Sequence, residues 1–169
     1  PEDAQKLLDA LKCNFEGYDE LREFLLSAPK FGNNIEVVDN ETAELTNKIA
    51  DMVRAEKNYL GNNFRPDFST PSTHLLYGYW VGALPCGRKS RDMLNYGLDP
   101  LYGEAQNGLG FRTLSLMKLP FEKMCGGYAS HFGIDPKYFA SADYEGKGVE
   151  FRDKVMKPLF FNELNENVA

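Results

Sequence analysis

The sequence predicts an α/β segment in which helices come first and strands with long loops follow. Three observations support this prediction. Residues 1–61 carry apolar side chains at helical spacing, residues 62–134 hold aromatic and β-branched runs interrupted by Gly and Pro, and residues 135–169 return to loop and helix. A length of 169 residues, 43% of them apolar, is enough to fill a core and favours a single segment over several domains.

The first third is predicted to form three helices. The apolar residues of the first helix share one face and are Leu7, Leu8, Leu11 and Phe15. The second helix is short and ends at Ala28, because the residue before Pro29 is pushed out of the α region. The third is expected to take Asp39 or Asn40 as its N-cap and to stop at Gly61.

Strands are expected in the middle of the chain. Leu75–Val81 is the strongest candidate, because a continuous apolar run is typical of a strand covered on both faces. Arg112–Leu119 and Gly127–Ile134 are further candidates. The chain is expected to close with a helix over Gly148–Leu164, which Pro158 must kink or end early.

Charge and composition exclude several classes of protein. The net charge of −6 argues against nucleic acid as the main partner, which would need a basic face. No apolar run approaches the roughly 20 residues of a membrane helix, and the first residues form a charged amphipathic pattern rather than a signal peptide. The three cysteines are odd in number and far apart, which fits a reducing cytoplasm better than a disulfide framework.

Cysteine and histidine side chains are candidates for chemistry. No pair has CxxC or HxxxH spacing, so we predict no metal site. A cysteine could act as a nucleophile with His74 or His131 as its base, although nothing in the sequence places such a pair together. Cys13 and Cys125 are interpreted instead as structural residues.

A long connection at residues 82–103 is a further candidate site. It contains four glycines and two prolines, which favour an ordered loop over helix or strand. Arg88 and Lys89 in it could bind a carboxylate or a phosphate, or they could pair with nearby acids and donate to carbonyl groups around the turn. His74 stands at the mouth of the strongest strand candidate, where ligands of α/β proteins often bind; the alternative is a half-buried histidine satisfied by its neighbours.

Two motifs in this order resemble segments of the glycyl radical enzymes. Residues 29–33 (PKFGN), followed by Val38-Asp39, resemble the family's PKFGND…D segment, and residues 82–89 (GALPCGRK) resemble its G-A-x-P-[DN]-G-R-K loop. The spacing of the loop's continuation is matched by Leu94, Gly97, Pro100, Gly103 and Gly108, and Ser115 and Lys118 stand where the family has its next strand. The departures from the family pattern are Asn34, Cys86 and Ser90-Arg91.

The resemblance implies a ten-stranded α/β barrel whose interior shields a radical from water and oxygen. It also implies a glycyl radical, a thiyl-forming cysteine, a radical-SAM activating enzyme and a homo-oligomer as the complete state. The sequence contains neither an R-V-x-G-[YF] run nor a C-x-E loop. We therefore expect no catalytic residue in this chain, which would be an internal segment that needs the rest of the same polypeptide. A partial barrel would expose strand edges and an apolar face, so alone it should associate.

The sequences of residues 91–112 and 126–139 resemble those of the large subunits of arylacetate decarboxylases, among them those that act on 4-hydroxyphenylacetate. That resemblance would imply a small iron–sulfur subunit. The alternatives are another glycyl radical enzyme (a diol dehydratase, a choline lyase or pyruvate formate-lyase) and, in a different class, a non-catalytic α/β binding or structural module.

The resemblance also suggests which residues contact substrate. Phe68 and Ser69 align with a position that lines the pocket in relatives, and Phe68 could offer an apolar wall to an aromatic ring. The alternative is that Phe68 packs beneath the barrel rim. His74 is the third candidate, at the start of the expected barrel strand Leu75–Val81. A helix at Leu75–Val81 would count against the barrel.

Overall fold

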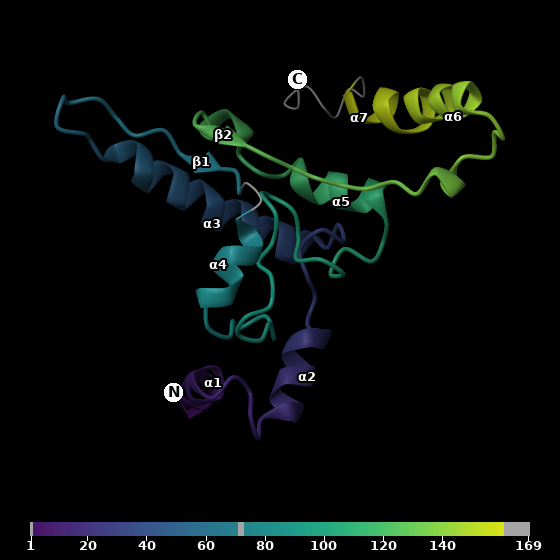
Figure 1. Cartoon of the computed structure of the whole chain (residues 1–169). Helices are drawn as coiled ribbons and strands as arrows, with labels where there is room; N and C mark the ends of the chain where they lie inside the picture. The colour runs from purple at the N-terminus through teal and green to yellow at the C-terminus, as the bar shows by residue number, and fades with distance from the viewer. Residues whose placement is uncertain (1, 71–72, 161–169) are drawn as a thin grey trace.

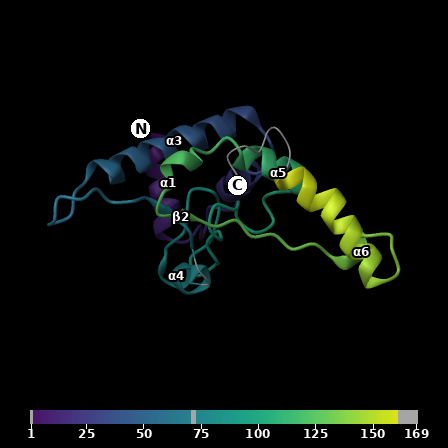
Figure 2. The same cartoon turned by 90° about the horizontal axis from the view of Figure 1, so that it is seen from above.

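The computed structural model describes residues 2–70 and 73–160 (Figure 1). Two-residue strands and short helices follow three N-terminal helices. The elements are α1 (Glu2–Lys12), α2 (Asp19–Ser27), α3 (Glu36–Ala55), β1 (Asp67–Phe68), α4 (His74–Trp80), α5 (Leu109–Leu116), β2 (Gly127–Tyr128), α6 (Tyr144–Phe151) and α7 (Lys157–Phe160). Short 3₁₀ turns lie at Phe121–Lys123 and Pro136–Tyr138, and a π-helical turn at Arg152–Met156 joins α6 to α7. Long connections link the elements, and α6 lies away from the three N-terminal helices in both views (Figures 1 and 2).

Three N-terminal helices form as predicted, but the limits of the first and third are wrong. The first ends at Lys12, so Phe15, which has φ +64°, lies outside it. The extended backbone of Ala28 (ψ 147°) ends α2 before Pro29, as predicted. By contrast, α3 begins at Glu36 with Ile35 as its cap and ends at Ala55. Asp39 lies in the first turn of α3 and is fully buried, so its carboxylate serves tertiary contacts instead of a cap.

Two of the three strand predictions are wrong. Leu75–Val81 falls on helix α4, and Arg112–Leu119 falls largely on helix α5. A short apolar run has the same appearance in a buried strand and in a helix, so periodicity could not separate the two. The third candidate, Gly127–Ile134, contains a strand of two residues.

The closing helix begins four residues earlier than predicted, at Tyr144, because Asp143 caps it by accepting a hydrogen bond from Gly146 N–H. A π-helical turn precedes Pro158, which cannot donate a backbone hydrogen bond. The last four residues of the predicted range, 161–164, lie outside the described residues.

The strands β1 and β2 pair in parallel and join distant parts of the chain, with Asp67 opposite Gly127 and Phe68 opposite Tyr128. A small core lies beside them, built on the buried Leu116, Leu119 and Met124. Partly buried apolar residues packed against this core are Phe31, Ala43, Phe68, Leu98 and Phe121.

Much apolar surface remains exposed outside this core. On α4, the exposed fractions reach 56% for Leu75 and 67% for Trp80. A large exposed apolar area on a soluble chain usually marks a contact surface. Within residues 2–70 and 73–160, no helix has the length and apolar character needed to cross a membrane.

Gly126 is expected to be essential to the β1–β2 junction. Its N–H donates to Pro66 O at 2.8 Å, and a Cβ at this position would lie 2.5 Å from that oxygen. We expect Gly126→Ala to lower the free energy of unfolding by about 1–3 kcal/mol through overpacking, measured by chemical denaturation. Gly133→Ala is the matched control, because a Cβ there meets no atom within 4 Å. Equal loss in both variants would contradict the steric explanation.

Candidate functional site

Arg88 is the centre of the loop at residues 82–89. Its side chain is 3% exposed. The guanidinium donates to five backbone carbonyls, those of Gly78, Val81, Gly82, Asp92 and Met93. Gly78 on α4 permits this approach, since a Cβ there would lie 3.2 Å from the guanidinium and 3.1 Å from Met93 Cα. Arg88 therefore closes the loop on itself and against α4.

The same loop is attached to α2. Arg22 Nε donates to Gly87 O at 2.9 Å. Gly87 has φ +93°, and a Cβ there would lie 2.8 Å from Leu26 Cγ, so both backbone and space require glycine. The neighbouring Lys89 contributes its backbone N–H, which donates to Asp92 Oδ2 at 3.2 Å.

The PKFGNN loop at residues 29–34 docks on the segment that follows residues 82–103. Asn33 makes the connection with both ends of its amide group. Its Nδ2 donates to Glu104 O at 2.8 Å, and its Oδ1 accepts from the N–H groups of Gln106 (2.9 Å) and Asn107 (3.2 Å). The two sequence motifs are thus parts of one connected structure.

Asp39 forms a buried link between α3 and the end of α5. Its Oδ2 accepts from Ser115 Oγ at 3.0 Å and from Lys118 Nζ at 2.9 Å. Ser115 Oγ in turn accepts from Asn34 N–H at 2.8 Å. Asp39 Oδ1 is buried without a hydrogen-bond partner among the described residues.

Asp99 and Arg112 form a second buried link. The Arg112 guanidinium is bonded to Asp99 Oδ1, and their side chains are only 9% and 8% exposed. Arg112 also donates to Ser130 Oγ (2.6 Å) and His131 O (3.0 Å), while Asp99 Oδ2 accepts from His131 N–H (2.5 Å). The pair holds residues 94–101, α5 and the segment after β2 together.

The three residues predicted to contact substrate are not brought to one cavity. Phe68 packs against the small core and lines a cavity of about 360 Å³. His74 lines a second cavity of about 430 Å³. Ser69 is exposed, and hydrogen bonding from Ser69 to Asp67 lowers the pKa of the Asp67 carboxyl. Their contact with substrate stays a prediction.

The loop at residues 94–101 separates these two cavities, because four of its residues line both: Leu94, Asp99, Pro100 and Leu101. In the second cavity, the Tyr96 ring contacts two imidazoles. Its centroid is 4.4 Å from that of His74 and 3.9 Å from that of His131, both in edge-on arrangements. The Nδ1 atom of His74 is buried and has no hydrogen-bond partner in the described part of the chain.

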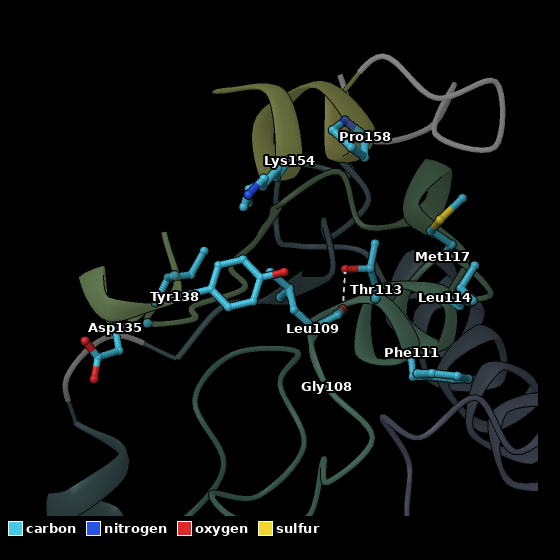
Figure 3. Close-up of a pocket in the computed structure, with 14 residues that line it drawn as sticks. Gly108, Leu109, Phe111, Thr113, Leu114, Met117, Asp135, Tyr138, Lys154 and Pro158 are labelled. Carbon is cyan, nitrogen blue, oxygen red and sulfur yellow. Dashed lines mark hydrogen bonds between the residues drawn. The ribbon is translucent and has the colours of Figure 1, made fainter. Parts of the chain in front are cut away.

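A larger cavity of about 800 Å³ lies between α5 and the C-terminal helices (Figure 3). Figure 3 shows Leu109 and Thr113 on α5 at one side, Tyr138 opposite them, and Lys154 and Pro158 on the helices above. The hydroxyl group of Thr113 donates to Leu109 O at 2.9 Å, so its proton is not free for a ligand. This cavity has mostly apolar walls, which suit packing as well as binding.

Glu150 holds the turn before α6. Its Oε1 accepts from Ser141 N–H at 2.7 Å and its Oε2 from Lys154 Nζ at 2.5 Å. The hydrogen bond from Lys154, followed by those from Ser141, lowers the pKa of Glu150 to about 2. Elsewhere, burial raises the pKa of Glu104, opposed by the charge of Lys30.

The cysteines carry no sign of a metal or a disulfide within the described residues. All three are free thiols: Cys13, Cys86 and Cys125. Across residues 2–70 and 73–160, no group of three or more His, Cys, Asp or Glu side chains could hold a metal ion.

Sequence reasoning missed Tyr96 as the residue that joins His74 to His131, and it missed the Asp99–Arg112 pair. The available signal was weak. Both Tyr96 and Asp99 lie in a loop whose glycine and proline spacing was recognised, but spacing alone does not indicate which side chains turn inward. Arg112 was placed on a strand, which hid its helical relation to the buried Ser115 and Leu116.

Comparisons of the sequence and of the structure with known proteins point to the same protein family. Residues 2–78 match the family model for "Pyruvate formate lyase-like" proteins. The chain is 31% identical over 175 residues to trans-4-hydroxy-L-proline dehydratase of Clostridioides difficile, an alignment that covers 98% of this chain and 22% of that relative. The chain therefore spans about a fifth of the length of this curated relative.

Two solved structures are similar in fold. One is the glycerol-bound B12-independent glycerol dehydratase from Clostridium butyricum, at 29% identity and TM-score 0.78. The other is a glycyl radical enzyme from Archaeoglobus fulgidus, at 28% identity and TM-score 0.78. Each match covers 86% of this chain and 18% of the other. The α/β barrel class, of which this chain represents a part, is confirmed. The chain belongs to the pyruvate formate lyase-like family of glycyl radical enzymes.

Proposed function

We propose that this chain is part of a glycyl radical dehydratase that removes water from a small hydroxylated substrate. The observation that carries the proposal is the 31% identity to a hydroxyproline dehydratase across 98% of the chain. The likeness to a glycerol dehydratase supports the same reaction class. Both named relatives eliminate a hydroxyl group from a small, non-aromatic compound.

In this proposal the chain supports the active site and forms part of its wall, and the residues that carry the radical lie elsewhere in the complete polypeptide. The sequence lacks the R-V-x-G-[YF] and C-x-E motifs that the radical chemistry of the family requires. What it contains is a set of polar links, half-buried at Asn33 and buried at Arg88 and Asp99, that fix loops against one another and against helices. Such links keep a site within a fraction of an ångström of its working geometry. A radical-SAM activating enzyme is the expected partner.

Arylacetate decarboxylation is the second candidate. The sequences of residues 91–112 and 126–139 favour this reaction. It would imply a small iron–sulfur subunit as a partner and a substrate such as 4-hydroxyphenylacetate. An aromatic acid would then require an apolar wall, for which Phe68 is the predicted residue.

One experiment separates the candidates. The complete polypeptide that carries this sequence is activated anaerobically by its radical-SAM enzyme, and the glycyl radical is counted by electron paramagnetic resonance. The activated protein is then incubated separately with glycerol, trans-4-hydroxy-L-proline and 4-hydroxyphenylacetate. We expect a dehydrated product from one of the first two. Release of CO₂ from 4-hydroxyphenylacetate would establish the decarboxylase instead. Failure to form a radical under conditions that activate a known dehydratase would favour a non-catalytic module.

A further inference from the structure

We propose that α3 carries a second packing face, formed by Leu45, Ile49 and Met52, and that an amphipathic helix from the complete polypeptide, outside these 169 residues, covers it. We call this face the α3 seam. The proposal rests on the family of the chain and is independent of the reaction that the complete enzyme catalyses. It identifies the residues of an interface and the kind of element that covers them.

The first argument is that α3 has two separate apolar faces. On one face, Ala50 is fully buried and Ala43 packs against the small core. Leu45, Ile49 and Met52 recur at spacings of four and three residues, so they share a different side of the helix. At about 3.6 residues per turn, the α3 seam lies roughly 140° around the axis from Ala43 and Ala50. The small core therefore cannot cover both faces.

The second argument is that the described residues leave the α3 seam largely uncovered. The exposed fractions are 59% for Leu45, 42% for Ile49 and 70% for Met52. The charged side chains of Glu44 and Lys48, which form an ion pair, lie on a third side of the helix. Removing apolar side chains from water is the main driving force for packing. Figure 2 shows α3 along one edge of the molecule, where a further element can pack against it.

The third argument identifies the covering element as a helix. Apolar residues at i, i+4 and i+7 form the narrow seam along which one helix packs on another. The backbone groups within α3 already bond to one another, so they cannot pair with an added strand. A helix satisfies its own backbone groups and offers only side chains to the seam. Met52 is suited to such a contact, because its flexible side chain adapts to the shape of its neighbours.

The fourth argument favours the same polypeptide over a second copy of it. The α3 seam spans two turns, about 10 Å of helix, whereas a stable interface between separate proteins takes roughly 20–30 residues a side. This chain spans about a fifth of the length of its curated relative, which leaves ample polypeptide for a covering helix. A helix tethered within one polypeptide acts at a high effective concentration and needs no such area.

The first test needs no variant. Hydrogen peroxide converts accessible methionine to its sulfoxide, and peptide mass spectrometry gives the rate at each methionine of the complete, native polypeptide. Met124, which is 2% exposed, is the buried standard, and the denatured polypeptide is the exposed standard. We expect Met52 to react at least about tenfold more slowly in the native than in the denatured polypeptide, close to the rate of Met124. A native rate near the denatured one would overturn the proposal.

The second test identifies the covering element. A photoreactive diazirine analogue of methionine at position 52 of the complete polypeptide is irradiated, and its cross-links are mapped by mass spectrometry. We expect cross-links to residues outside this segment that are spaced three or four apart, as on one side of a helix. The same analogue at Glu44, on the charged side of α3, is the control and should give none.

Three outcomes of the second test would overturn the proposal. A cross-linked product of doubled mass on a denaturing gel would show that a second copy covers the α3 seam. Cross-links at every second residue would show a strand in place of a helix. The absence of any cross-link from position 52 would show that the seam faces water. Neither test measures turnover, so their failure would leave the dehydratase proposal intact.

Discussion

Replacing Arg88 with alanine is expected to lower the free energy of unfolding by more than about 3 kcal/mol. The side chain is buried and its guanidinium donates to five backbone carbonyls, all from residues 78–93. Alanine would leave these carbonyls facing a void, and each buried group without a partner costs about 1–3 kcal/mol. Water entering the space would recover part of that cost. Chemical denaturation of the complete polypeptide, followed at the transition that includes this segment, measures the loss.

Two further variants separate geometry from charge at this position. Arg88→Lys keeps the positive charge but replaces the planar fork of donors by a single ammonium group, so we expect an intermediate loss. Lys89→Ala removes the adjacent cation. The described hydrogen bond of Lys89 is made by its backbone N–H, so we expect the free energy of unfolding to change by no more than about 0.5 kcal/mol. Equal stability of Arg88→Ala and Lys89→Ala would contradict a structural role for the guanidinium.

The N-terminal helices could be predicted because their apolar residues recur with helical period. In α4 that signal fails. Its run of apolar residues has no polar face, although large side chains such as Leu75 and Trp80 are exposed in this chain. A continuous apolar run is equally typical of a buried strand. The expectation that a helix at this position counts against the barrel family is wrong, because the chain is similar to solved glycyl radical enzymes.

The motifs located the important loops but not what their side chains do. The resemblance placed Asn33 and Arg88 in the two family motifs. The structure shows why those residue types suit their positions, because the amide of Asn33 both donates and accepts and the guanidinium of Arg88 has five donors. The partners of these groups are backbone atoms, which any sequence supplies. Such contacts depend on tertiary approach, so a single sequence cannot reveal them. For the same reason, the contacts of Tyr96 with the two histidines could not be predicted.

Removing one member of the Asp99–Arg112 pair is expected to lower the free energy of unfolding by about 3–5 kcal/mol, because it leaves the other charge buried without a partner. Arg112→Met should therefore destabilise strongly, and Asp99→Leu likewise. The double variant should lose markedly less stability than the sum of the two single losses, since neither charge then remains. A double-mutant cycle by chemical denaturation measures this coupling. The exposed pair of Lys48 and Glu44 on α3 is the control, with about 0.5 kcal/mol or less expected for Lys48→Ala. Additive losses at Asp99 and Arg112 would mean that the two charges do not stabilise each other, and the loop that separates the two cavities would then be held by its other contacts.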